Sequence, residues 1–361
     1  MKDLLTDIGR WRAHGKRVAL ARVIALDGSG PRDPGAAMAV NEDGEVAGSV
    51  SGGCVEGAVV TEALDVLATG TARRATFGYS DDEAFAVGLT CGGTVHLFVE
   101  PLPDAIADAV AENVPVVVAS VVEGPHTGAH LVVRPDDDRT GTLGNADLDR
   151  VVVRDAIAAL ASGTTSMRHY GACGEARQDE VTVFIEAFGP PPRMLIFGAV
   201  DFTGALVRTA KVLGYHVTVC DARAVFATRA RFPVADEVVV DWPDRLLAAV
   251  GAGLGPRDAV CVLTHDHKFD VPAIQAALAT GVGYIGAMGS RLTHAERLER
   301  LRSEGVTDDQ LARLMAPIGL DIGARTPEET AVAVCAEIIA LRTGRPARHL
   351  KEGAGPIHAE E

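Results

Sequence analysis

Gly48-Ser49-Val50-Ser51-Gly52-Gly53-Cys54, continued by the residues up to Thr71, decides the fold of the first half of the chain. The same pattern recurs without a gap over residues 141–164. Each stretch predicts a glycine-rich turn followed by a helix, and the first helix should bury Val59, Ala63, Val66 and Leu67 on one face. We therefore interpret residues 1–103 and 104–189 as two copies of one α/β unit.

The two copies differ in three loops. Residues 18–24 pair with 116–122, and residues 94–100 pair with 180–186. Copy two has a shorter loop where copy one has residues 27–35. It also has Gly144-Asn145-Ala146-Asp147 opposite Ser51–Cys54, and Arg177-Gln178-Asp179 opposite Cys91-Gly92-Gly93. A fold that both copies share cannot require residues that one copy lacks. We therefore predict one functional site, assembled from three loops of copy one.

Cys54 is the leading candidate in this site. It is predicted to stand at the start of a helix, where the helix dipole lowers a thiol pKa and favours bound anions. Ser51, Gly52 and Gly53 would turn backbone N–H groups toward an anionic ligand. Cys91 and Arg32 are weaker candidates, since a turn and a solvated arginine also explain them. Glu56 pairs with Asp149 of copy two, so a structural role at the helix start explains this acid.

The second half predicts a different architecture. Gly189-Pro190-Pro191-Pro192 is a stiff linker, and beyond it buried strands alternate with helices. Strands are expected at 194–198, 216–221, 237–240, 259–263 and 284–287. This order predicts a Rossmann-like, doubly wound parallel sheet over residues 193–345, followed by a loosely ordered tail at 346–361.

Several residues of this second domain are candidates for ligand binding. Gly198 follows the first strand, and Asp221 ends the second strand, where an acid usually binds ribose hydroxyls. Val200 and Thr203 occupy the second and third glycine positions of a dinucleotide-binding fingerprint. The loop therefore matches the NAD-binding pattern poorly. Further candidates follow later strands and would face the same crevice; they are His265, Asp266, Ser290, Arg291 and Asp321. The two histidines and two aspartates of 265–270 are too poorly spaced to predict a metal site.

Composition narrows the class of protein. The chain has 361 residues, 47% of them hydrophobic and 23% charged, and a net charge of −15 without a basic cluster. This argues against nucleic acid or an anionic membrane surface as the main partner. Acids near the start and the lack of a long apolar run predict a cytoplasmic protein. The six cysteines have no Cys-x-x-Cys pair, and we expect free thiols.

The motifs together resemble the xanthine dehydrogenase accessory factor family, the XdhC/CoxI proteins. The resemblance rests on Gly28–Gly35, Ser51–Glu56, Cys91-Gly92-Gly93, Thr264–Asp270, Tyr284–Arg291 and Pro317–Gly323 with Thr326-Pro327-Glu328. It implies a maturation factor that binds molybdenum cofactor, as molybdopterin or its dinucleotide form. It also implies help in sulfurating the cofactor and inserting it into an apo-molybdenum hydroxylase of the xanthine or carbon monoxide dehydrogenase type, with a cysteine desulfurase as second partner.

Two other interpretations stay open. An NAD(P)-dependent oxidoreductase would explain the sheet and Asp221, but neither Val200 nor the unequal copies. A ligand-free scaffold protein is the other alternative. The duplicated chain suggests a homodimer.

Overall fold

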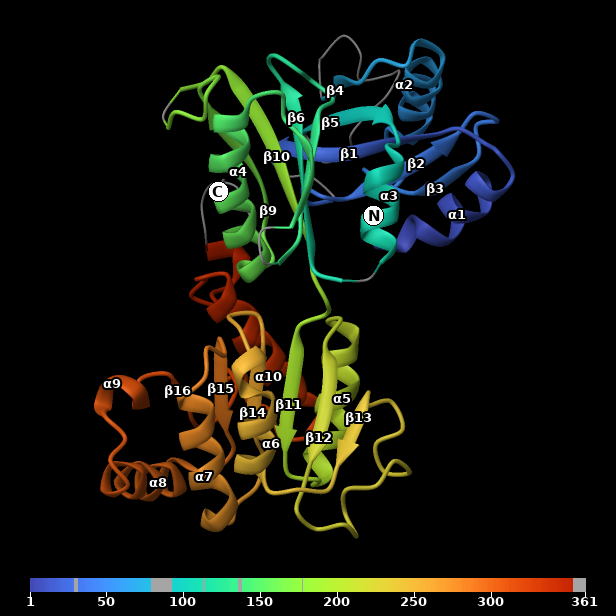
Figure 1. Cartoon of the computed structure of the whole chain (residues 1–361). Helices are drawn as coiled ribbons and strands as arrows, with labels where there is room; N and C mark the ends of the chain where they lie inside the picture. The colour runs from blue at the N-terminus through green and yellow to red at the C-terminus, as the bar shows by residue number, and fades with distance from the viewer. Residues whose placement is uncertain (29–31, 79–92, 113, 136–137, 177, 353–361) are drawn as a thin grey trace. The chain divides into compact units, whose positions relative to one another are not determined.

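The computed structural model describes residues 1–28, 32–78, 93–112, 114–135, 138–176 and 178–352 (Figure 1). They form two compact units, which divide between Pro190 and Pro191, within the expected linker. The two expected amino-terminal copies belong to one unit. Each unit is described by itself below.

The first unit contains two antiparallel sheets with the same strand order. The first sheet runs β3-β2-β1-β5-β4 and the second β8-β7-β6-β10-β9. Around the first sheet, the elements are η1 (Lys2–Leu4), α1 (Leu5–Ala13), β1 (Val18–Asp27), β2 (Ala37–Asn41), β3 (Val46–Gly48), α2 (Glu56–Thr69), β4 (Arg73–Phe77) and β5 (Thr94–Pro101). Around the second, they are α3 (Asp104–Ala111), β6 (Val116–Glu123), β7 (His130–Val133), β8 (Arg139–Thr142), α4 (Ala146–Ser162), β9 (Thr165–Tyr170) and β10 (Val181–Phe188).

One helix covers one face of each sheet. Helix α2 buries Val59, Ala63, Val66 and Leu67 against the first sheet, the face that the sequence pattern predicted. Helix α4 packs on the second sheet in the same way. Burial of an apolar helix stripe on a sheet is the main stabilisation of such a layer.

The opposite faces of the two sheets meet around one buried arginine. The guanidinium of Arg22 on β1 forms ion pairs with Glu100 on β5 and Glu186 on β10. The rings of Phe98 and Phe184 lie 5.8 and 5.7 Å from it. The repeat alignment pairs Glu100 with Glu186 and Phe98 with Phe184, so equivalent positions of the two sheets flank a single charge. Ser120, the counterpart of Arg22, accepts a 3.1 Å hydrogen bond from the same guanidinium.

The second unit is a doubly wound parallel sheet with the order β13-β12-β11-β14-β15-β16, which is the Rossmann arrangement. Helices α5 and α10 contribute to the core on one face, and α6, α7 and α8 to the core on the other (Figure 1). The elements are β11 (Arg193–Phe197), α5 (Asp201–Val212), β12 (His216–Cys220), β13 (Glu237–Val239), α6 (Pro243–Val250), η3 (Gly251–Gly253), β14 (Ala259–Val262), α7 (His267–Leu278), β15 (Tyr284–Ala287), α8 (Arg291–Ser303), α9 (Asp308–Leu311), β16 (Leu314–Met315), α10 (Pro327–Arg342) and η4 (Leu350–Glu352).

The expected fold class is confirmed: five parallel strands lie where the sequence predicted them. The sixth, β16, has only two residues and was not expected. Helix α10 begins with Thr326 as N-cap, Pro327 in the first turn and Glu329 completing a capping box. In the tail, the structure adds the short helix η4.

Candidate functional site

The three candidate loops of the first unit leave the same edge of the first sheet. Strand β1 ends where β5 begins, with Asp27 paired to Thr94. A side chain on Gly28 would lie 3.8 Å from the Cα of Gly93. Leu26, Ala36 and Cys54 pack against the same apolar cluster under α2. The described ends of all three loops therefore lie close together.

The turn before α2 is organised around the carboxylate of Glu56. Its Oε1 accepts hydrogen bonds from Ser49 Oγ at 2.6 Å and from the Ser51 N–H at 3.0 Å. Its Oε2 accepts from Ser51 Oγ at 2.5 Å and from the Gly53 N–H at 2.9 Å. The Gly52 N–H donates to Ser49 Oγ, and the Cys54 N–H to Ser51 Oγ.

This network corrects the expected anion cradle. We predicted that Ser51, Gly52 and Gly53 would offer free N–H groups to a ligand, but protein oxygens accept all three. Glu56 itself is the anion at this helix start. Burial acts to raise the pKa of Glu56, but the hydrogen bonds from Ser49 and Ser51 outweigh it and lower the pKa to about 2.

The second sheet has an equivalent turn. Asp149, which the repeat pairs with Glu56, accepts from Thr142 Oγ1 at 2.7 Å and from the Leu143 N–H at 2.8 Å. This confirms the structural role predicted for the acid at the helix start. Asn145 stands opposite Gly52 and caps α4 with its side chain, whereas α2 has no side-chain cap.

The first turn differs from the second in its two glycines, Gly52 and Gly53, which stand opposite Asn145 and Ala146. Gly52 and Gly53 have φ angles of +77° and +120°, which disfavour other residues. Among the described residues, and apart from the direct chain neighbours, no atom would lie within 4 Å of a Cβ at either glycine. Cys54 is a free, half-buried thiol two residues before α2. Arg32 is exposed on the loop after β1. Cys91 lies outside the described residues.

The sequence missed a polar cluster at the same edge. His96 Nε2 lies 2.8 Å from Asp27 Oδ2, and His96 Nδ1 lies 3.0 Å from Thr76 Oγ1. Val95 and Leu97 pack under α2, so His96 faces the other side of the sheet. The cluster ties together the strand ends from which two of the candidate loops begin.

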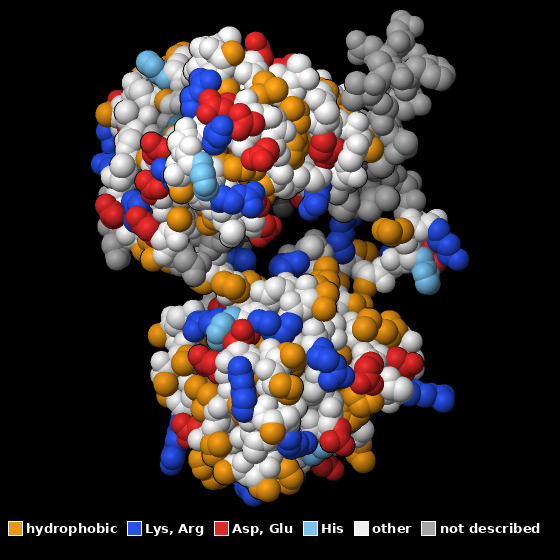
Figure 2. Space-filling model, turned by 90° about the vertical axis from the view of Figure 1, so that its right-hand side faces the viewer, with side chains coloured by type: hydrophobic (Ala, Val, Ile, Leu, Met, Phe, Trp, Pro, Cys, Tyr) orange, Lys and Arg blue, Asp and Glu red, His pale blue; other side chains and the backbone are white. Residues whose placement is uncertain are grey.

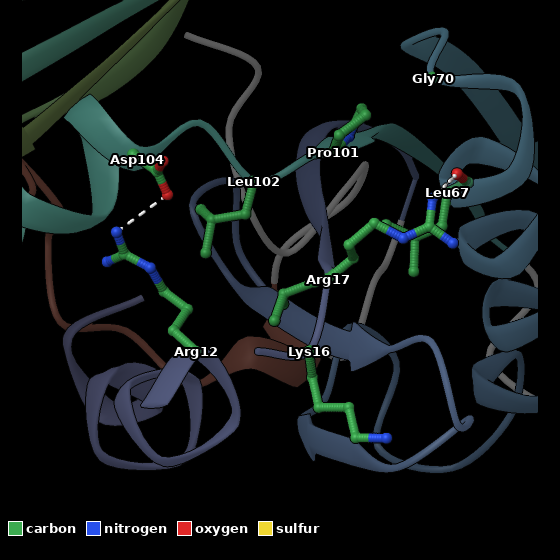
Figure 3. Close-up of a pocket in the computed structure, with 9 residues that line it drawn as sticks. Arg12, Lys16, Arg17, Leu67, Gly70, Pro101, Leu102 and Asp104 are labelled. Atoms are coloured by element: carbon green, nitrogen blue, oxygen red, sulfur yellow. Dashed lines mark hydrogen bonds and ion pairs between the residues drawn. The ribbon is translucent and has the colours of Figure 1, made fainter. Parts of the chain in front are cut away.

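A hollow of about 310 Å³ lies elsewhere in the first unit (Figure 3). Arg12, Lys16 and Arg17 line it, but each already has a partner. Arg12 pairs with Asp104 at 2.8 Å and Lys16 with Asp43 at 2.6 Å. Arg17 donates to the Leu67 carbonyl at 2.8 Å, near the end of α2. These cations join α1 and β1 to neighbouring elements, and we assign them a structural role.

In the second unit, the loops after β11 and β14 touch at the point where the strand order reverses. A Cβ on Gly198, whose φ is +113°, would lie 2.8 Å from Thr264 Cγ2. Buried Thr203 donates a hydrogen bond to the Gly198 carbonyl. The third glycine position of the fingerprint is thus filled by a side chain that braces the loop.

Asp221 does not occupy the role that its position suggested. It is 3% exposed. Its Oδ2 accepts hydrogen bonds from the Ala199 N–H at 2.8 Å and from Arg223 Nη2 at 2.7 Å, and its Oδ1 accepts one from Arg223 Nε at 2.9 Å. Burial acts to raise the pKa of Asp221, but the bonds from Arg223 and Ala199 lower it. Both carboxylate oxygens are engaged, so a ribose at the predicted position would have to displace protein donors.

Arg297 is a buried residue beside the loops after β14 and β15, and the sequence analysis did not identify it. Its Nη2 donates to Asp270 Oδ2 at 3.0 Å and to the Met288 carbonyl at 2.8 Å. Asp270 also accepts from Thr264 Oγ1. Arg297 and Asp270 are each 1% exposed. The pair therefore links the loops after β14 and β15.

The remaining candidates lie on exposed loops of the same unit. Asp266 caps α7 and pairs with Lys268 at 3.1 Å, and His265 beside it is exposed. Ser290 caps α8. Arg291 approaches Asp321 to 3.9 Å, so the structure brings these two predicted residues together.

Aromatic and cationic side chains line the neighbouring loops after β12, β13 and β14. Arg223 lies 4.5 Å over the ring of Phe226, and Lys268 lies 4.8 Å over Phe269. Trp242 lies 5.0 Å from Phe269 and is 39% exposed. Flat aromatic ligands stack on surfaces of this kind.

Charges of both signs are interspersed on the face shown in Figure 2. Among the described residues, no group of three or more His, Cys, Asp or Glu side chains is placed to hold a metal ion. Within the same residues, no helix combines the length and apolar character needed to cross a membrane.

Comparison with known proteins gives consistent matches. The family model of the XdhC Rossmann domain matches residues 194–338, and that of the XdhC and CoxI family matches residues 11–78 and 109–171. The chain is 29% identical over 340 residues to a Bacillus subtilis protein that is named as a probable xanthine dehydrogenase subunit. This match covers 91% of this chain and 94% of that protein.

A second relative is the molybdenum cofactor insertion chaperone PaoD of Escherichia coli. It is 27% identical over 333 residues, which cover 91% of this chain and 84% of PaoD. A solved structure described as a xanthine dehydrogenase from Bacillus halodurans shares the fold, with a TM-score of 0.70 and 24% identity. That match covers 96% of this chain and 97% of the other.

Proposed function

We propose that this chain, which belongs to the XdhC and CoxI family, binds molybdenum cofactor and assists its insertion into a molybdenum hydroxylase. The observation that carries the proposal is the similarity to an insertion chaperone over 91% of this chain and 84% of that protein. The similarity extends over both units of the chain. This favours a shared activity over the sharing of a single domain by proteins with different activities.

In this proposal, the edge of the first sheet receives the molybdenum end of the cofactor. The part of the chain that the structure describes places no atom within 4 Å of a Cβ at Gly52 or Gly53, other than those of direct chain neighbours, and this supports a ligand at the turn. Cys54 supplies a soft sulfur ligand, which suits molybdenum or the transfer of sulfur. The turn's N–H groups are engaged by Glu56 and the serines, so they position the loop and do not grip the ligand.

Taken by itself, the crevice of the second unit is proposed as a surface that binds a pterin or nucleotide ring. Trp242 and the Arg223–Phe226 pair offer surfaces for stacking a flat ring. Arg223 and Lys268 supply positive charge near it, and Arg291 is a further exposed cation of this unit. Engagement of Asp221 makes an NAD-like grip on a ribose unfavourable, which weighs against the oxidoreductase alternative.

We further propose that the two sheets of the first unit are copies of one ancestral unit. Their common strand order and the equivalent residues around Arg22 support this. The partners in the proposal are an apo-molybdenum hydroxylase of the xanthine or carbon monoxide dehydrogenase type and a cysteine desulfurase. The working form is a cytoplasmic homodimer.

A reconstitution assay tests the proposal. An apo-molybdenum hydroxylase is incubated with isolated molybdenum cofactor, with and without this chain, and recovered activity and bound molybdopterin are measured. We expect faster recovery with the chain, and slower recovery with Cys54→Ala than with Cys173→Ala, the exposed cysteine of the second sheet. Equal recovery with and without the chain would contradict the proposal. Equal recovery with both cysteine variants would remove Cys54 from it.

A further inference from the structure

A second hollow, of about 520 Å³, lies in the first unit on the side of the second sheet. It is lined by Arg139, Arg150, Val153, Arg154 and Ile157. Arg139 begins β8, and the other four residues lie on α4 with the spacing of one helix face. We call these five residues the arginine hollow. None of the proposed cofactor contacts belongs to it.

The first sheet shows that the fold does not require these arginines. The repeat places Val46, Gly57 and Thr61 at the positions of Arg139, Arg150 and Arg154. Those residues lie on β3 and α2, which have the same places in the same strand order. One sheet therefore has three cations on a surface that is uncharged at the matching positions of the other sheet.

The arginines are open to other partners. The side chains of Arg150 and Arg154 are 74% and 77% exposed. Within the described part of the chain, each forms an ion pair with a neighbour on its own helix, Arg150 with Asp147 at 2.6 Å and Arg154 with Asp155 at 3.7 Å. Exposed ion pairs of this kind are weak and exchange readily. Ile157 is 44% exposed beside them and adds an apolar side chain to the hollow.

The strand next to the hollow is also uncovered. Strand β8 is at the edge of its sheet, and all four of its residues are exposed. Its counterpart β3 is covered by the amino-terminal segment, where Leu4 Cδ2 would lie 2.6 Å from a Cβ on Gly48. At Gly141, which corresponds to Gly48, the nearest described atoms belong to β7 of the same sheet.

We propose that the arginine hollow and β8 bind an acidic, extended segment of a partner protein. The carboxylates of the segment would pair with Arg139, Arg150 and Arg154, and an aliphatic side chain would cover Ile157. Arginine is enriched at protein interfaces, and guanidinium groups bind carboxylates in a bidentate manner. A chain with a net charge of −15 repels acidic partners elsewhere, so a local group of three arginines would select the docking site.

The geometry favours a protein segment over a small anion. A built site for a small anion has buried cations and converging N–H groups, whereas the cations here are largely exposed and spread over two elements. An extended segment can reach all three and can lie along the free edge of β8.

Fluorescence anisotropy of the full chain with a labelled peptide tests this proposal. The probe is a short peptide of glutamates with a central leucine, and the reference peptide has glutamine at each glutamate. We expect saturable binding of the first peptide only, with affinity falling as salt rises. We expect the double variant Arg150→Glu, Arg154→Glu to bind at least tenfold more weakly.

The matched control is the double variant Arg10→Glu, Arg208→Glu. It changes the net charge by the same amount, at arginines that are 62% and 59% exposed and also pair with a nearby acid. The control should bind like the unaltered chain, and thermal unfolding should show both variants folded.

Three results would overturn the proposal. The two peptides could bind alike, the Arg150/Arg154 variant could bind like the unaltered chain, or both variants could lose affinity equally. Binding of single-stranded oligothymidylate, but not of the acidic peptide, would assign the hollow to nucleic acid instead.

Discussion

Glu56→Gln tests whether the carboxylate organises the turn before α2. Glutamine keeps the size of the side chain and can still accept hydrogen bonds at Oε1, where Ser49 and the Ser51 N–H donate. At the other position it presents an NH2 group, so the Gly53 N–H loses its acceptor. We expect the variant to destabilise the first unit.

The size of the effect follows from the pKa. Lowering the pKa of Glu56 from 4.5 to about 2 corresponds to roughly 3.4 kcal/mol, at about 1.4 kcal/mol per tenfold change in affinity for the proton. Glu56 is only half-buried, and solvent screens part of this interaction, so we expect about 1.5 to 2 kcal/mol at pH 7.

The sign of the pH dependence follows from linkage. The pKa of Glu56 is lower in the folded than in the unfolded chain, so its contribution is complete above the unfolded pKa near 4.5. It is lost as the pH falls toward about 2. The difference in unfolding free energy between the unaltered chain and Glu56→Gln should therefore shrink between pH 7 and pH 3.

Urea unfolding followed by tryptophan fluorescence provides the assay. The chain has two tryptophans, so a Trp242→Phe background leaves buried Trp11 of α1 as the reporter of the first unit. The second unit has the same sequence in both proteins and contributes no tryptophan fluorescence. A free-energy difference that is the same at pH 7 and pH 3, or that is absent at pH 7, would refute the reasoning.

Two further predictions concern the second unit. Arg297→Met leaves the Asp270 carboxylate buried without its cation, so we expect a loss of about 3 to 5 kcal/mol in unfolding free energy, read from Trp242 fluorescence; unchanged stability would contradict the buried pair. Titration with NADH should give no saturable fluorescence change, because Ala199 and Arg223 donate to Oδ2 of Asp221 and Arg223 also donates to Oδ1; saturable binding would contradict this account of the crevice.

The elements that the sequence predicted well have strong patterns of burial. The buried face of α2 and five strands of the parallel sheet follow from apolar periodicity alone. The strands it missed are short or exposed: β8 is exposed throughout, and β16 has only two residues. Such strands form because a neighbouring strand offers partners for their backbone hydrogen bonds. A local stretch of sequence does not show this.

The long-range polar contacts were not predictable from a local pattern. Arg22 lies within an apolar strand, and its partners Glu100 and Glu186 are far away in the sequence. Arg297 and its partner Asp270 are also far apart in the sequence. The alignment of the two copies did point to the partners of Arg22, because it pairs Glu100 with Glu186.

The candidate site was predicted in its location but not in its chemistry. Comparison of the copies identified the three loops, whose described ends do lie at one edge. The comparison could not predict that the Glu56 carboxylate would accept hydrogen bonds from N–H groups of the turn. These bonds depend on the path of the backbone through Gly52 and Gly53. Arg223 stands two residues from Asp221 and could have indicated an ion pair.

The molybdopterin content of the purified chain tests the central claim most directly. The chain is purified from cells that make molybdenum cofactor, and its pterin is released, oxidised to a fluorescent form and quantified per mole of protein. We expect molybdopterin to copurify at a substantial fraction of one per chain, and to fall in Cys54→Ala. Pterin at the level of an unrelated protein purified from the same cells would contradict the account.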